Sequence, residues 1–88
     1  MKKNRLIFIL ESIHQVLHAE KVLHTAGLDF DIIPVPKEIN PECGMALEVD
    51  PKEKDQINAA LIQARIKIKA LYYRSGQTFE EIPADLPS

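Results

Sequence analysis

The sequence has little of several features that would point to a specialised class of protein. Its 88 residues include one cysteine, and the longest uninterrupted apolar run, Leu6–Leu10, has five residues. A single cysteine excludes an internal disulfide framework and is typical of a reducing compartment. Five apolar residues are too few to span a bilayer or to form the core of a signal peptide. We therefore expect a cytoplasmic protein with no membrane partner.

An excess of charge of either sign is also missing. The chain carries 11 lysines and arginines against 13 aspartates and glutamates, a formal net charge of -2. This balance gives no basic footprint for nucleic acid and no polybasic run for an anionic membrane. We expect no nucleic-acid partner.

Motifs for catalysis and cofactor binding are absent as well. The sequence has no glycine-rich phosphate loop, no catalytic-triad spacing and no pair of acids arranged for acid–base chemistry, so we expect no cofactor. His14 and His18 are spaced by one helical turn, and His24 follows in the same segment. No carboxylate or cysteine is fixed within their reach, which favours solvated surface histidines over a metal site.

The first half of the chain predicts a strand, a helix and a second strand. Leu6–Leu10 is apolar without alternation, as in a strand covered on both faces. Ser12 and Gln15 have the spacing of a capping box and predict the start of a helix that ends at Gly27. The apolar stripe expected on this helix comprises Ile13, Val16, Ala19, Val22, Leu23 and Ala26. The second strand falls within Leu28–Val35, and Pro34 assigns it to a sheet edge because proline has no N–H to donate.

The second half predicts a strand, a helix and a further strand. Met45–Val49 alternates as a strand does, and Asp50, Pro51 and Glu53 have the capping-box pattern of a helix start. The segment Ile66–Tyr73 fits either a strand or the continuation of that helix. We favour the strand because β-branched and aromatic residues cluster there.

This order of elements predicts an α+β fold of the ferredoxin-like type, βαββαβ. A four-stranded antiparallel sheet would carry two helices on one face. We expect one domain over residues 1–75, followed by an irregular tail over residues 76–88 that docks on the domain or on a neighbouring chain. In this topology the first and third strands are antiparallel neighbours, so the start of the third strand should lie beside the end of the first.

The loop between the second and third strands holds the candidate functional residue, Cys43. Prolines restrict the loop before it, and Gly44 after it has no Cβ, so a bulky thiol adduct could approach closely. The expected topology brings Cys43 to Ser12, at the amino end of the first helix, where the helix dipole and free amides lower the pKa of a thiol. His14 in the first turn would stabilise the thiolate when protonated, and Glu42 would oppose it.

Several segments around this loop resemble a known family. Pro34-Val-Pro-Lys37, the run from Cys43-Gly44 to Leu47, and Ala19–Leu23 with Gly27 are similar to the selenium/sulfur carrier-like proteins, over about Leu6 to Tyr73. Two positions depart from the family pattern. Asn40–Glu42 replaces small serines before the Cys-Gly pair, and Arg65 stands where the family tends to have glycine.

The resemblance implies a thiol carrier. Cys43 would hold sulfur or selenium as a persulfide or perselenide between a donor protein and an acceptor enzyme, and it is our candidate catalytic residue. Gly44, Ser12, His14 and Lys37 are the candidates to contact the adduct, although an ordinary surface lysine is the favoured interpretation of Lys37.

Two other classes of protein remain open. One is a small interaction or regulatory module in which Cys43 is a structural cysteine and edge strands pair into a homodimer. The other is an enzyme in its own right, which is disfavoured because a lone thiol without a base or oxyanion site is a poor catalyst. Substitution of Cys43 by serine distinguishes the carrier from the interaction module.

Overall fold

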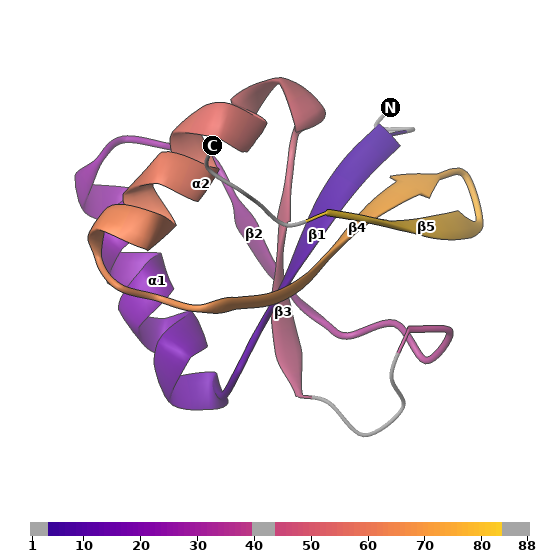
Figure 1. Cartoon of the computed structure of the whole chain (residues 1–88), viewed down its shortest axis with the longest axis horizontal. Helices are drawn as coiled ribbons and strands as arrows, with labels where there is room; N and C mark the ends of the chain where they lie inside the picture. Colours follow the sequence, from indigo (N-terminus) through magenta and orange to yellow (C-terminus); the bar gives the residue numbers. More distant parts are fainter. Residues whose placement is uncertain (1–3, 40–43, 84–88) are drawn as a thin grey trace.

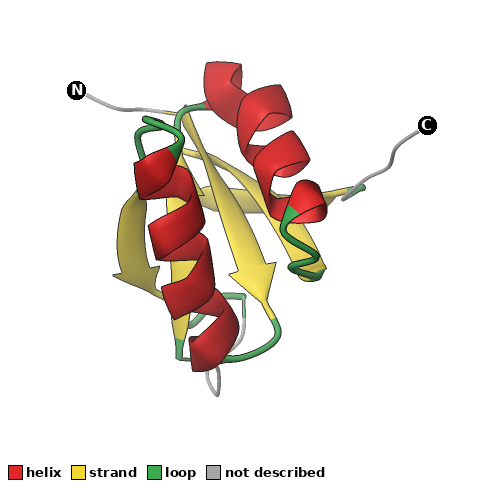
Figure 2. Ribbon diagram, turned by 90° about the vertical axis from the view of Figure 1, so that its left-hand side faces the viewer, coloured by secondary structure: helices red, strands yellow, loops and turns green. Residues whose placement is uncertain are grey.

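The chain forms a two-layer α+β fold, in which helices cover one face of an antiparallel sheet (Figures 1 and 2). The computed structural model describes residues 4–39 and 44–83. The strands are β1 Asn4–Leu10, β2 Asp31–Pro34, β3 Met45–Val49, β4 Ile68–Ser75 and β5 Thr78–Ile82. The helices are α1 Ile13–Thr25, the short 3₁₀ turn η1 Pro51–Glu53 and α2 Lys54–Gln63. The sheet order is β2-β3-β1-β4-β5, which confirms the α+β class and places β2 at an edge as predicted.

β1 is the central strand, and both of its faces are buried. Every residue from Arg5 to Leu10 is buried, which agrees with the apolar run lacking alternation. Leu6, Phe8 and Leu10 belong to the core between sheet and helices. Ile7 and Ile9 belong to a second apolar cluster on the opposite face. Strand β1 therefore joins the two halves of the protein interior.

The helix-side core is built from one line of residues on each helix. Val16, Ala19 and Leu23 of α1 and Ile57 and Leu61 of α2 are buried against the sheet. The expected apolar stripe of α1 was too wide at both ends. Ile13 is 48% exposed and Ala26 is also exposed. Both positions lie in the terminal turns, beyond the line that faces the sheet.

The two helix starts are capped by side chains, each in a different way. The Gln15 amide donates to Ser12 Oγ over 3.3 Å, which is one half of the predicted capping box, while Gln15 Oε1 has no partner among the described residues and the reciprocal bond is not formed. At the second start the Lys52 amide donates to Asp50 Oδ1 over 3.0 Å. The Glu53 amide donates to the Asp50 backbone oxygen, so the expected box between Asp50 and Glu53 is replaced by the 3₁₀ turn η1. A proline at the first position of η1 is consistent with this tight turn.

The prediction of four strands is wrong, because part of the expected irregular tail forms β5. Ser75 pairs with Thr78 across a two-residue turn, and Gly76 has φ of +64°, which glycine adopts without steric cost. Thr78 Oγ1 also donates to the Ser75 backbone oxygen over 2.8 Å. Phe79 and Ile82 then pack against the two apolar clusters. The preference for a strand over a continued helix in Ile66–Tyr73 is confirmed, although β4 begins only at Ile68.

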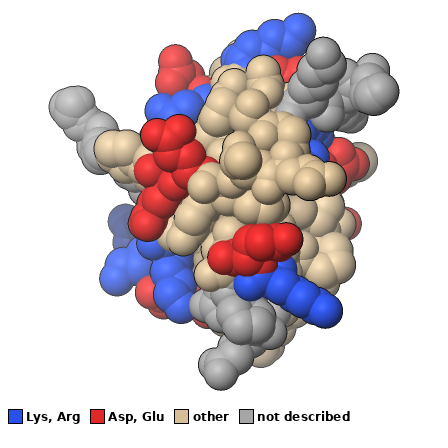
Figure 3. Space-filling view, turned by 90° about the vertical axis from the view of Figure 1, so that its right-hand side faces the viewer, with Lys and Arg blue, Asp and Glu red and all other residues tan. Residues whose placement is uncertain are grey.

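The face of the sheet away from the helices has uncharged residues at its centre and charged residues around them (Figure 3). Ile7, Ile9, Val35 and Ala46 are buried there, partly covered by side chains such as Tyr72. Within residues 4–39 and 44–83, no helix is both long enough and apolar enough to cross a membrane.

Candidate functional site

The candidate site lies where β1 ends, α1 begins and β3 starts. β1 and β3 are antiparallel neighbours, with Ile9 opposite Ala46, as the expected topology requires. Cys43 and the preceding Asn40–Glu42 lie outside the described residues. Gly44 is the first described residue after this gap. Residues 36–43, between Val35 and Gly44, are called the cysteine segment below, and Gly44 marks where this segment joins the sheet.

Both ends of the cysteine segment are anchored to the sheet. The Val35 amide donates to the Gly44 carbonyl oxygen over 3.1 Å, which extends the β2–β3 ladder by one pair. Val35 is 8% exposed and packs in the second apolar cluster, where Ile39 joins it. The Ile39 amide donates to the Pro36 oxygen over 2.9 Å and closes a turn. The apolar anchors therefore fix where the segment leaves and rejoins the sheet.

Gly44 is exposed directly before β3, and its role beside a thiol adduct stays a prediction. A Cβ built there would meet no described atom within 4 Å, and its φ lies outside the left-handed region. The backbone at this position is therefore open to other residues. Gly44 leaves free space beside the strand but is not required for a turn.

Ser12 lies at a small pocket beside the amino end of α1. The pocket has a volume of about 250 Å³ and is lined by Glu11, Ser12, Gln15, Arg65 and Lys67. Two cations face one carboxylate, and the first amides of α1 add the positive end of the helix dipole. Gln15 Oε1 is buried, and no described group bonds to it. The pocket therefore offers a positive environment beside Ser12.

Arg65, which stands where the family pattern has glycine, is a pocket residue that was not predicted to belong to the site. It has φ of +63° and is the one described non-glycine residue with positive φ. The Arg65 amide donates to Ile62 O and the Ile66 amide to Leu61 O, the pattern by which a helix ends in a left-handed residue. Glycine usually occupies such a position, so Arg65 carries its charge at a conformational cost. The absence of the family's glycine at this position was the sequence signal that could have identified Arg65 as a site residue.

The remaining candidate residues are not gathered in this pocket. His14 is exposed in the first turn of α1, and Lys37 is exposed in the turn after β2; neither lines the pocket. His18 and His24 are exposed on α1. Among the described residues, no group of three histidine, cysteine or acidic side chains could hold a metal ion. The described part of the site thus consists of the pocket residues Glu11, Ser12, Gln15, Arg65 and Lys67, near the start of β4, with β3 and Gly44 on the other side of β1.

Comparison with known sequences assigns the chain to a class of carrier-like proteins. The family model described as "Putative Se/S carrier protein-like" matches residues 5–73. The chain therefore belongs to this family. The matched range includes Cys43, the cysteine segment and the pocket beside Ser12.

A curated relative agrees with this class. The chain is 32% identical over 84 residues to a protein of Aquifex aeolicus (strain VF5) whose name is "Putative sulfur carrier protein". The aligned region covers 93% of this chain and 43% of the relative, so the chain spans less than half the length of that protein. No solved structure gives a significant match.

Proposed function

We propose that the protein carries sulfur or selenium on the thiol of Cys43. The thiolate attacks the outer chalcogen of a donor persulfide, R–S–SH, or of its selenium analogue. The bond between the donor's inner sulfur and its outer chalcogen breaks, R–S⁻ leaves, and Cys43 holds –S–SH or –S–SeH. A nucleophile of the acceptor protein then takes the outer atom and regenerates the thiolate. No net oxidant or reductant is needed in either transfer.

The family match over residues 5–73 is the observation that carries this proposal. The register of the sheet adds geometric support. Ile9 pairs with Ala46, so continuing the two strands would bring Gly44 opposite Glu11 and Cys43 beside Ser12. At that place the amino end of α1 favours an anion.

The charges around Ser12 strengthen the case for a reactive thiol. Arg65 and Lys67 line the pocket next to the helix end, and both favour a negative sulfur nearby. Glu42 opposes the thiolate, Lys37 is a further cation for an adduct that extends into solvent, and His14 would add to it when protonated. We propose that the fixed helix end and the two pocket cations outweigh Glu42. The pKa of the Cys43 thiol is then lower than that of a free cysteine.

The wider assignment follows from the same proposal. The partners are a chalcogen donor protein and an acceptor enzyme, and the carrier acts in the cytoplasm without a cofactor of its own. We further infer that β2, β3, β1 and β4 with the two helices form a ferredoxin-like unit in residues 1–75, to which β5 is added.

The alternative function is an interaction module that dimerises through a sheet edge. One observation weighs against the β2 edge. Val35 N–H points into the β2–β3 ladder, and amides alternate in direction along a strand, so the ring nitrogen of Pro34 faces outward. The exposed edge therefore lacks a donor at that position, and a neighbouring strand would pair poorly there.

Titration of the thiol tests the proposed function. Thiolate absorbance and iodoacetamide alkylation rate are followed against pH for the wild type and for Lys67→Met, which keeps the fold but removes one pocket cation. The wild-type thiol should titrate below a model thiol, and the variant should titrate higher than the wild type. A Cys43 that titrates above a model thiol, or reacts only after unfolding, contradicts the carrier and favours the interaction module.

A further inference from the structure

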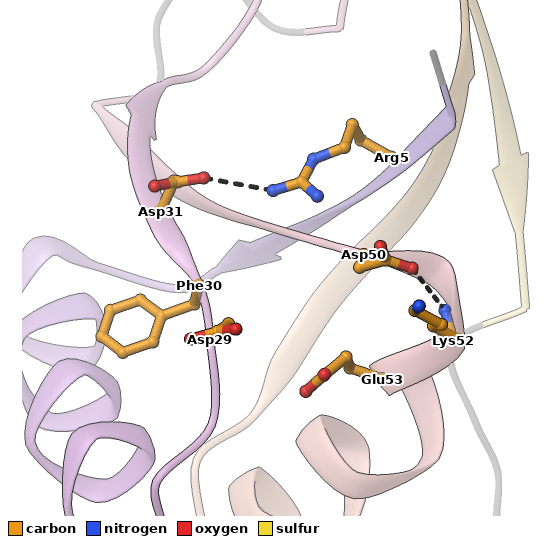
Figure 4. A pocket seen from close by; sticks show the side chains of 7 residues that line it. All are labelled: Arg5, Asp29, Phe30, Asp31, Asp50, Lys52 and Glu53. Carbon is orange, nitrogen blue, oxygen red and sulfur yellow. Dashed lines mark hydrogen bonds and ion pairs between the residues drawn. The ribbon is translucent and has the colours of Figure 1, made fainter. Parts of the chain in front are cut away.

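A second and larger pocket lies at the opposite end of β1 from Gly44. Its volume is about 470 Å³, and its lining comes from the start of β1, the approach to β2 and the start of η1 (Figure 4). The lining residues are Arg5, Asp29, Phe30, Asp31, Asp50, Lys52 and Glu53. This volume is within the range of sites for small molecules.

A buried arginine forms one side of this pocket. The Arg5 side chain is 5% exposed, and its Nη2 donates to Asp31 Oδ2 over 3.1 Å. Its Nε lies 3.6 Å from Glu48 Oε1, too far for a hydrogen bond, and no described group bonds to it. Glu48 is held instead by Arg74, with 2.8 Å between Oε2 and Nη2. Arg5 is thus nine-tenths buried, and its Nε, on the side of Glu48, has no hydrogen-bond partner among the described residues.

The orientation of Arg5 directs donor capacity toward the pocket. Figure 4 shows one terminal nitrogen bonded to Asp31 and the other turned away from Asp31, toward the side where Asp50 lies. The terminal nitrogen that is turned away from Asp31 can donate to an oxygen acceptor in the pocket, such as a carboxylate. An anion alone is disfavoured here, however, because the rest of the lining is acidic.

The rim of the pocket favours a cation rather than an anion. Four carboxylates, Asp29, Asp31, Asp50 and Glu53, face two cations, Arg5 and Lys52, so the lining has a formal charge of -2. Asp31 is held by Arg5, and Asp50 accepts from the Lys52 amide. Asp29 is exposed and Glu53 is half-buried, and both can accept from an ammonium group.

We propose that this pocket binds the zwitterionic head of a free α-amino acid. The ligand carboxylate accepts from Arg5, and the ammonium donates to Asp29 and Glu53. Only a ligand with both charges satisfies the buried donor and the acidic rim together. The formal charge of -2 selects neutral or basic side chains and rejects acidic ones. This inference does not depend on the chemistry of Cys43.

Ligand truncation tests the two halves of the site separately. The ¹⁵N-labelled full chain is titrated with L-alanine, with L-alaninamide, which lacks the carboxylate, and with N-acetyl-L-alanine, which lacks the ammonium. Amide signals of residues 29–31 and 50–53 should shift with L-alanine. Each truncated ligand loses a charged hydrogen bond and should bind more weakly than L-alanine by about tenfold or more. L-lysine should bind more tightly than L-alanine, and L-glutamate should not bind. Equal affinity for either truncated ligand, or no shift with any amino acid, overturns the proposal.

Matched acidic variants locate the binding to this pocket. Asp29→Asn removes one rim charge and should weaken L-alanine binding by about tenfold. Asp55→Asn removes an exposed carboxylate of α2 that does not line the pocket, and it should leave binding unchanged. Both side chains are exposed, so the fold should persist in each variant. Equal weakening by both variants would show a general charge effect and would contradict a site at Asp29.

Discussion

The two ends of β1 carry charge in opposite ways. At the carboxyl end, a pocket of about 250 Å³ combines the exposed cations Arg65 and Lys67 with the amino end of α1. At the amino end, a pocket of about 470 Å³ has four carboxylates and the buried cation Arg5. The exposed cations are solvated and contribute little to the free energy of unfolding. The buried Arg5 charge, in contrast, is tolerated only because its carboxylate partners are present. The first pocket is therefore suited to tune a thiol, and the second is part of the framework as well as a candidate site.

Replacement of the buried cation should have the largest effect on stability. Arg5→Met leaves Asp31 without its partner and Glu48 with only Arg74, and we expect a loss of about 2–4 kcal/mol in the free energy of unfolding. Asp31 is 56% exposed and can regain water, which places the loss toward the lower end. Urea denaturation measures it, with Lys67→Met at the other end as the matched control, expected within about 0.5 kcal/mol of wild type. Equal losses for both variants would contradict the contrast between the two ends.

Removal of the α1 cap should have an intermediate effect. Ser12→Ala deletes the acceptor for the Gln15 amide, and we expect a loss of about 1 kcal/mol. Thermal and urea unfolding measure this loss, and Ser12→Asp, which keeps an acceptor, should restore most of it. If Ser12→Ala were as stable as wild type, the cap would not hold the amino end of α1 in place.

Relief of the strained backbone should have the smallest effect, and in the opposite direction. Arg65→Gly places glycine at φ of +63° and should stabilise the fold by about 0.5–1 kcal/mol, while removing a pocket cation. Gly27→Ala is the reverse control, because it introduces a Cβ at φ of +75°, and it should destabilise the fold by about 1 kcal/mol. We expect Arg65→Gly to raise the pKa of the Cys43 thiol despite its greater stability. A variant that loses stability would show that Arg65 has a structural rather than an electrostatic role.

Much of the fold could be predicted because the local signals agreed with one another. The apolar run of β1 and the alternation of Met45–Val49 each matched the observed strand, and Ser12 caps α1 as its spacing indicated. β5 was missed because Phe79 and Ile82 are separated by two glutamates, and its pairing depends on β4 being present first. Ile13 was misassigned because helical periodicity gives the face of a residue but not how far the sheet extends beneath it.

The candidate site was only partly accessible to sequence reasoning. The adjacency of β1 and β3 followed from the order of the elements, and it holds. The pocket residues Arg65 and Lys67 come from a loop that only the folded chain brings to Ser12. The Arg5 pocket was not predicted, because Arg5 precedes the apolar run and reads as a surface residue. Its burial depends on Asp31 and Glu48 from two other strands.

The most direct test of the carrier function is loading of the thiol, measured by intact-mass spectrometry. The full chain is incubated with a cysteine desulfurase and either L-cysteine or L-selenocysteine, which load the donor enzyme with a persulfide or its selenium analogue, alongside the Cys43→Ser variant. The wild type should gain the mass of one sulfur or one selenium atom, a reductant should remove it, and the variant should gain nothing. A wild type that gains no mass, although its Cys43 is readily alkylated in the same preparation, would contradict the carrier function, as would equal loading of the variant.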